Sequence, residues 1–278
     1  MKGDSELKAI GVPVSLLMSL YIKENPKYLL EALESICEQK SYPQQVVIVL
    51  DGPILSEHQQ ILDQFISNYI GNVKVVPLVQ NQGLGVALAI GVEACDQELI
   101  ARMDTDDIMT SDRIEKEYEQ FCQQTHLGIV GSNICEFSET TTNILGYRKV
   151  PEHNDEIRNF SKRRNPFNHM TVMYRKADVL KAGNYCPLPG FEDYYLWVRM
   201  LKHGTVGYNI QENLVFARTG VDMYSRRGGI RYLAPGLKAR KRIYQEGLGS
   251  FSDFIFVSFV HLIVSLMPNK LRGFFYEK

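Results

Sequence analysis

Three apolar runs alternate with amphipathic segments over the first eighty residues, and this alternation constrains the fold more than any other feature. The runs are Val14–Leu20, Val46–Leu50 and Val73–Val79. The second run holds no polar residue, as expected of a parallel strand covered by helices on both faces. Helical periodicity fills the intervals, and a helix, a strand and another helix follow. We therefore predict an α/β fold with a mostly parallel central sheet, right-handed crossovers and flanking helices.

Polar residues follow the carboxyl ends of these predicted strands. They are Ser19 and Tyr21 at the first strand, Asp51 after the second, Asn81 after the third, and Asp104, Asp106 and Asp107 after the fourth. Because the carboxyl ends of parallel strands meet at one edge of a sheet, ligands bind there in folds of this class. We expect these side chains to gather in one ligand site.

The stretch Ala101–Ile108 places three carboxylates within four residues. Three anions so close together repel one another, and a divalent metal ion would offset their charge. On an extended chain Asp104 and Asp106 point to the same side and can share a ligand, whereas Asp107 points away and supports the loop. The alternative is an acidic turn that caps the next helix.

The second half of the chain has a less regular pattern. It predicts a β-excursion over residues 137–150, a short helix over 153–160 and a strand over 171–174. Glu192 and Asp193 follow a Pro/Gly turn and open a helix, where the helix dipole alone would account for two acids. Arg226 and Arg227 precede two glycines and either clamp a phosphate or form a solvated basic loop.

Residues 254–267 form an apolar run that Ser258, His261 and Ser265 interrupt along one helical stripe. A helix of this length measures about 21 Å and is too short for the roughly 30 Å hydrocarbon core of a bilayer. Lys270 and Arg272 follow it. We predict an interfacial membrane segment within residues 251–278, with a core or dimer helix as the alternative, and a packed role for His261.

The composition limits the partners and the cellular compartment to be expected. The 278 residues carry a net charge of −1, so no overall positive field indicates a nucleic-acid partner. Five scattered cysteines without a C-x-x-C pair predict a reducing compartment and neither a disulfide framework nor a zinc site. The N-terminus has no apolar signal segment. We expect a cytoplasmic protein, peripheral on the inner face of the plasma membrane if the C-terminal segment binds lipid.

The order of four segments resembles the motifs of family 2 of the inverting glycosyltransferases, including its DXD motif. The segments are Asp51, Asn81-Gln82-Gly83-Leu84, Ala101–Asp107 and Glu192-Asp193. The resemblance covers about residues 12 to 230 and implies the GT-A fold. It divides the chain into a GT-A domain over 1–230, with a nucleotide-binding half over about 12–132 and an acceptor-binding half over about 133–230, and a helical extension over 231–278. The C-terminal Leu-Met-Pro-Asn-Lys-Leu-Arg segment is similar to bacterial members that build capsular or O-antigen polysaccharides.

The resemblance implies a metal-dependent, inverting transfer of a sugar from a UDP- or dTDP-sugar to a hydroxyl of a glycan or lipid-linked saccharide. The nucleotide sugar would be bound by Ser19, Tyr21, Asp51, Asn81, Asp104, Arg226 and Arg227. Asp104 and Asp106 would hold Mn²⁺ or Mg²⁺. Asp193 would be the general base and Glu192 would orient the acceptor or the base. His169 would contact the phosphates, the metal or the acceptor, or would be a structural histidine.

Some positions depart from the family pattern, and other functions compete. Ser19-Leu20 replaces the usual Pro-Thr, Asp51-Gly52 replaces a usual pair of acids, and the Gln-x-x-Arg-Trp signature of processive members is absent, which favours single additions.

A sugar-nucleotide nucleotidyltransferase would share the metal-dependent pocket without needing a base at Asp193. A non-catalytic sugar-nucleotide-binding protein is a further alternative. A dinucleotide-binding oxidoreductase would need a third glycine where Leu88 stands.

Overall fold

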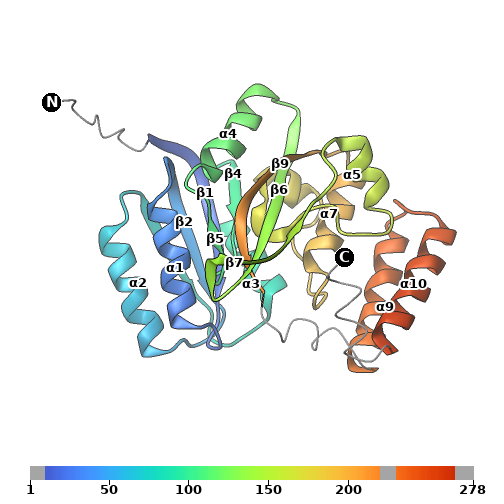
Figure 1. The fold of residues 1–278 in the computed structure, drawn as a ribbon, viewed down its shortest axis with the longest axis horizontal. Helices are drawn as coiled ribbons and strands as arrows, with labels where there is room; N and C mark the ends of the chain where they lie inside the picture. Colours follow the sequence, from blue (N-terminus) through green and yellow to red (C-terminus); the bar gives the residue numbers. More distant parts are fainter. Residues whose placement is uncertain (1–9, 220–229, 267–278) are drawn as a thin grey trace.

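A computed structural model describes residues 10–219 and 230–266, and its centre is one mixed β-sheet with helices on both faces (Figure 1). The strands lie in the order β3-β2-β1-β4-β8-β6-β9-β5, and β7 pairs with β6 outside this path. In chain order they are β1 (Ile10–Leu20), β2 (Ser41–Leu50), β3 (Asn72–Pro77), β4 (Leu99–Arg102), β5 (Ile108–Met109), β6 (Leu127–Ser138), β7 (Thr140–Arg148), β8 (Met173–Arg175) and β9 (Val206–Arg218). The predicted α/β class is confirmed.

The parallel part of the sheet consists of β3, β2, β1 and β4, and helices cover both of its faces. Every residue of Val46–Leu50 is buried, as the unbroken apolar run predicted. One face packs against α1 (Pro26–Cys37), α2 (Ser56–Asn68) and α4 (Arg113–Gln123). The other face packs against α3 (Leu84–Ala94), α5 (Asn154–Phe160), α6 (Lys176–Lys181) and α7 (Glu192–Lys202). The core therefore has two layers, one on each side of the strands.

Local sequence signals set the starts of the helices that follow β1 and β3. The side chain of Asn25 caps α1 by accepting from the Lys27 backbone N–H at 3.0 Å, and Pro26 fills the first helical position. Gly83 precedes α3 with φ 88°, a left-handed conformation that favours glycine. Both helices thus begin immediately after a strand-end loop, which places those loops at the carboxyl edge of the sheet.

The second half of the sheet departs from the predictions. β6 runs over twelve residues and pairs in parallel with β9. β9, β5 and α6 were not predicted, and the expected strand over 171–174 is divided between a 3-10 helix, η1 (His169–Thr171), and β8. β8 is antiparallel to both β4 and β6, so it joins the two halves of the sheet. The β-excursion is confirmed as the β6–β7 hairpin.

Two helices complete the described chain at the end of the molecule opposite α2 (Figure 1). They are α9 (Ile230–Gln245) and α10 (Phe251–Leu266), which pack against each other. Within residues 10–219 and 230–266, no helix is long and apolar enough to cross a membrane. The domain limits predicted above stay a prediction.

Candidate active site

The carboxyl ends of β2 and β3 bring Asp51 and Asn81 together. Asp51 is buried, and its backbone N–H donates to the Leu20 carbonyl at the end of β1, at 2.8 Å. Its carboxylate accepts from Asn81 Nδ2 at 2.9 Å, from the Gln82 N–H at 2.7 Å and from the Gly83 N–H at 3.0 Å. Asp51 therefore holds the loop that opens α3, a role that the sequence did not reveal. Its predicted contact with the nucleotide sugar stays a prediction.

The chain after β1 lies at the same edge. Ser19 is half-buried near the end of β1, and Tyr21 is exposed just beyond it. Three residues further, Glu24 Oε2 accepts from Thr105 Oγ1 at 2.6 Å, which joins this segment to the acidic turn after β4. The expected convergence of strand ends is thus present in the structure, and it includes Glu24, which the sequence analysis did not single out.

Asp104, Asp106 and Asp107 form one carboxylate cluster, with an oxygen of each within 4.8 Å of the others. The prediction that Asp107 points away is wrong. The chain turns at Thr105 and Asp106 instead of staying extended, so the strand alternation does not apply. Asp107 Oδ1 does support the loop, because it accepts from the Arg218 backbone N–H at 2.8 Å. Its Oδ2 is buried with no hydrogen-bond partner among the described residues.

The electrostatics of the carboxylate cluster favour a cation. Burial raises the pKa of Asp106 to about 7, and the neighbouring charges of Asp104 and Glu24 add to the rise. Burial, Asp106 and Asp104 raise the pKa of Asp107 well above its ordinary range. A divalent ion would offset this repulsion and would find carboxylate oxygens already close together, including the unpartnered Oδ2 of Asp107. The donor set therefore fits Mg²⁺ or Mn²⁺.

Arg102 is a buried cation directly behind the carboxylate cluster. Its side chain is 1% exposed and forms an ion pair with Asp104, while Nε and Nη1 have no hydrogen-bond partner in the described part of the chain. Its charge acts on Asp106, Asp107, His169 and Asp193. Arg102 was not among the predicted site residues, although an arginine inside an apolar strand that leads into three acids is a recognisable signal.

Two further arginines fix the backbone of the acidic turn. Arg113 of α4 donates from Nη2 to the Arg102 carbonyl at 2.8 Å. Arg218, at the end of β9, donates from Nε to the Asp106 carbonyl at 3.0 Å, in addition to its backbone bond to Asp107. Strands and helices that are distant in sequence therefore hold the turn from both sides.

Asp193 lies in the first turn of α7. The charge of Arg102 acts on Asp193 as well as on Asp104. Asn165 Nδ2 donates to Asp193 Oδ2 at 2.5 Å, a contact that the sequence did not predict. Burial raises the pKa of Asp193, and hydrogen bonds from the Tyr194 backbone and from Asn165 offset part of the rise. The carboxylate is thus made more basic while its orientation is held, which suits a proton acceptor.

Glu192 is buried beside the start of α3. A Cβ added at Gly85 would lie 3.0 Å from Glu192 Cγ and 3.0 Å from the Cys186 carbonyl oxygen, so the absence of a side chain at this position allows α3 and α7 to approach closely. Burial raises the pKa of Glu192 as well. The contact places the Asn81 loop and the two acids of α7 on the same side of the sheet.

His169 lies in an aromatic cluster next to Arg102. Its Nε2 is 3.0 Å from the Tyr185 hydroxyl, and its ring contacts Tyr185 and Trp197 with centroids 5.7 and 6.0 Å apart. Burial, with the charge of Arg102, lowers the pKa of His169 well below its ordinary value. These surroundings favour a neutral, packed histidine over a phosphate-binding cation, and a contact with the acceptor stays a prediction.

Arg226 and Arg227, the predicted phosphate clamp, lie outside the described residues.

Comparisons with known proteins identify one family model and several relatives named as glycosyltransferases. The family described as "Glycosyl transferase family 2" matches residues 15–182. An uncharacterized glycosyltransferase of Haemophilus influenzae is 38% identical over 95% of this chain and 97% of its own length. An Escherichia coli protein named UDP-Gal:alpha-D-GlcNAc-diphosphoundecaprenol beta-1,3-galactosyltransferase is 36% identical over 95% of both chains.

A solved structure resembles the fold. TarS from S. aureus, crystallised in complex with UDP-GlcNAc, superposes with a TM-score of 0.65 at 17% identity over 90% of this chain and 71% of that one. At this identity the likeness concerns the arrangement of strands and helices alone.

Proposed function

The chain belongs to glycosyl transferase family 2, and from this membership we propose that it moves a sugar from a UDP- or dTDP-sugar to a hydroxyl of a lipid-linked saccharide, with inversion and with a divalent metal ion. It is a glycosyltransferase with the GT-A fold expected from the sequence. The observation that carries the proposal is the carboxylate cluster of Asp104, Asp106 and Asp107, which pairs with buried Arg102, a cation whose charge also acts on Asp193.

We assign the proton transfer to Asp193. Its carboxylate takes the proton of the acceptor hydroxyl while that oxygen bonds to the anomeric carbon and the bond from this carbon to the leaving diphosphate breaks. Attack from the face opposite the leaving group inverts the configuration. Asn165 supports this role because its amide fixes one oxygen of Asp193, and Glu192 orients the acceptor beside it.

Asp104, Asp106 and Asp107 would hold Mg²⁺ or Mn²⁺, which when bound supplies positive charge for the departing diphosphate. The buried Oδ2 of Asp107 and the raised pKa of Asp106 support this assignment. Arg102 pairs with Asp104 and holds its carboxylate in place. Ser19, Tyr21, Asp51 and Asn81 bind the nucleotide sugar at the adjacent strand ends.

The acceptor class comes from the relatives. The Escherichia coli protein is named for a UDP-galactose donor and a diphosphoundecaprenol-linked acceptor, and a further relative, from Erwinia amylovora, is named as an amylovoran biosynthesis glycosyltransferase. We therefore propose a lipid-linked saccharide acceptor in cell-surface polysaccharide biosynthesis and a location at the inner face of the plasma membrane.

The experiment is a donor screen with the purified chain and a lipid-linked saccharide acceptor. We expect release of nucleoside diphosphate from one UDP- or dTDP-sugar, dependent on acceptor and abolished by EDTA, and an inverted anomeric configuration in the product. Release of inorganic pyrophosphate from a nucleoside triphosphate and a sugar phosphate would instead indicate a nucleotidyltransferase. Binding of donors without any turnover would indicate a non-catalytic binding protein.

A further inference from the structure

The outer face of α10 is apolar over its whole length. The exposed large apolar side chains of this helix are Phe251, Ile255, Phe256, Phe259, Val260, Leu262, Ile263 and Leu266. They recur at intervals of three and four residues and so cover about half of the helix circumference. In contrast, α1, α2, α3 and α6 each expose one large apolar side chain. An apolar face of this size, in which Ser252 is the one exposed polar side chain of the helix, marks an interaction surface.

Three polar residues of α10 face inward. The buried residues of the helix are Asp253, His261 and Ser265. Asp253 forms a capping box with Ser250, accepting from the Ser250 N–H at 2.9 Å while its own N–H donates to Ser250 Oγ at 3.2 Å. His261 packs against α9, where a Cβ added at Gly236 would lie 2.0 Å from its Nε2. These contacts fix the rotation of α10, with its apolar half outward.

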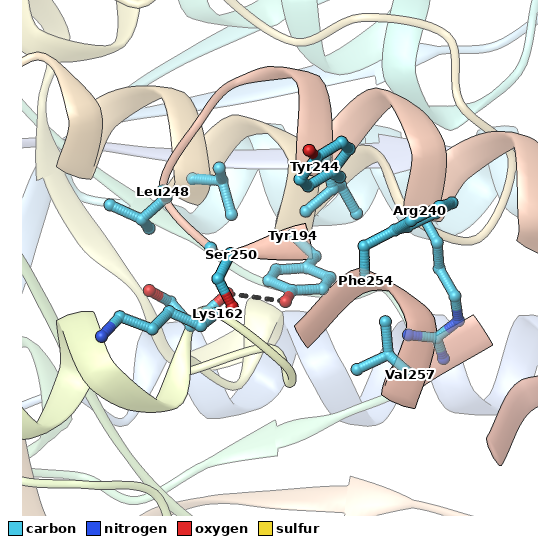
Figure 2. Close-up of a pocket in the computed structure, with 12 residues that line it drawn as sticks. Lys162, Tyr194, Arg240, Tyr244, Leu248, Ser250, Phe254 and Val257 are labelled. Atoms are coloured by element: carbon cyan, nitrogen blue, oxygen red, sulfur yellow. Dashed lines mark hydrogen bonds between the residues drawn. The ribbon is translucent and has the colours of Figure 1, made fainter. Parts of the chain in front are cut away.

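The hairpin of α9 and α10 is attached to the rest of the molecule through α7 (Figure 2). Tyr194 of α7 is buried, and its hydroxyl donates to the Ser161 carbonyl at 2.7 Å. Phe254 and Val257 of α10 line the same pocket. Since neither residue belongs to the exposed apolar half, this attachment uses the inner face of α10 and leaves the outer face open.

A basic turn, Lys162-Arg163-Arg164, adjoins the outer face. All three side chains are exposed. The Arg163 guanidinium pairs with Asp253 at 2.6 Å and lies 5.0 Å from the ring centroid of Phe256. Asp253 is the single acidic residue of α10, and residues 230–266 contain five basic and two acidic residues, whereas the whole chain has a net charge of −1. The basic turn thus places positive charge beside Phe256 of the apolar face.

We propose that the outer face of α10 and the basic turn 162–164 form a docking surface for an anionic lipid bilayer. The sixteen residues of α10 span about 24 Å, less than the roughly 30 Å hydrocarbon core, so the helix lies in the interface with its apolar half in the lipid. Lys162 and Arg164 contact anionic headgroups. A symmetric pairing of two copies through this face would bring both basic turns to one interface, which like-charge repulsion disfavours.

The inference rests on the proposed function in one respect: a lipid-linked acceptor presents its saccharide at the bilayer surface. The test is independent of transfer, because it uses vesicles without donor or acceptor. In a flotation assay the full-length chain should bind phosphatidylglycerol/phosphatidylethanolamine vesicles more strongly than phosphatidylcholine vesicles. The variant Phe259→Ser/Ile263→Ser should bind at least about tenfold more weakly. The control Ile70→Ser replaces a side chain after α2 that is more exposed than either Phe259 or Ile263, and it should bind like the unmodified chain.

The charge contribution has its own variant. Lys162→Gln/Arg164→Gln should lose most of the preference for anionic vesicles, and Lys40→Gln/Lys181→Gln, with the same loss of charge elsewhere, should keep it. Melting temperatures within a few degrees of the unmodified chain would establish that the variants fold. Absence of vesicle binding by the unmodified chain, or equal binding by Phe259→Ser/Ile263→Ser, would overturn the proposal. So would a dimer in light scattering that this variant converts to a monomer.

Discussion

Replacing Asn165 with alanine removes the hydrogen bond from its Nδ2 to Asp193 Oδ2, which measures 2.5 Å. The amide donates to the ionised carboxylate, so its loss raises the pKa of Asp193 further in the direction in which burial already moves it. A hydrogen bond to a charged group contributes about 1.5–3 kcal/mol. Since one pKa unit corresponds to about 1.36 kcal/mol, the pKa of Asp193 should rise by about one to two units.

The assay is the pH profile of kcat/KM for acceptor-dependent release of nucleoside diphosphate. A base must be ionised to accept a proton, so activity falls as the pH drops through the pKa of Asp193. In Asn165→Ala the acid limb of the profile should move to higher pH by about one to two units. At a pH below the acid limbs of both profiles, activity should be about ten- to a hundredfold lower than in the unmodified chain.

A suitable control is Asn159→Ala, because Asn159 is exposed on α5 and accepts from Lys162 Nζ, away from Asp193. Its profile should match that of the unmodified chain. The melting temperature of Asn165→Ala separates a catalytic effect from unfolding, since Asn165 Oδ1 also accepts from the Phe167 N–H at 3.3 Å. A folded Asn165→Ala variant whose acid limb does not move would refute the role assigned to Asn165 and Asp193.

Three more predictions concern the surrounding groups. Asp107→Asn keeps an acceptor for the Arg218 N–H but removes one negative charge from the carboxylate cluster. The Mn²⁺ concentration for half-maximal activity should therefore rise about ten- to a hundredfold. An unchanged concentration would show that Asp107 does not belong to the metal site. Arg102→Met leaves Asp104, whose side chain is 32% exposed, without its buried partner, and it should lower the free energy of unfolding measured in urea by about 1.5–3 kcal/mol. Lys116→Met, at a surface pair, should lower it by at most about 1 kcal/mol. His169 has a lower pKa in the folded than in the unfolded state, so the free energy of unfolding decreases as the pH falls below about 6.5, by up to about 1.36 kcal/mol per pH unit. The melting temperature of His169→Gln should therefore depend less on pH between 7 and 5 than that of the unmodified chain. The same dependence of melting temperature on pH in both proteins would contradict the pKa shift.

The parallel half of the fold could be predicted because local signals there agree with the tertiary structure. Val46–Leu50 is apolar because both of its faces are covered, and Asn25-Pro26 caps a helix by its own chemistry. The second half gave weaker signals. β9 was missed because it pairs with β6 from more than seventy residues away, and β5 has only two residues, so its pattern is too short to recognise. Long-range pairing of this kind leaves little trace in local periodicity.

In the candidate site, too, some features could be predicted from the sequence and others could not. The order of the strands allowed the convergence of Asp51, Asn81 and the acidic motif to be predicted, because the carboxyl ends of parallel strands share an edge. The orientation of Asp107 could not be predicted, since it depends on a turn at residues 105–106 held by Arg218 from β9. The pairing of Asn165 with Asp193 likewise requires two segments that are far apart in sequence to meet.

The most direct test of the account compares donor binding and sugar transfer in Asp193→Asn. The substitution preserves the shape of the side chain and removes its ability to accept the proton of the acceptor hydroxyl. We predict that the dissociation constant of the nucleotide sugar with Mn²⁺ stays near that of the unmodified chain while the rate of transfer falls about 10²- to 10⁴-fold. A variant that binds the donor and transfers the sugar at the full rate would contradict the central claim that Asp193 is the catalytic base.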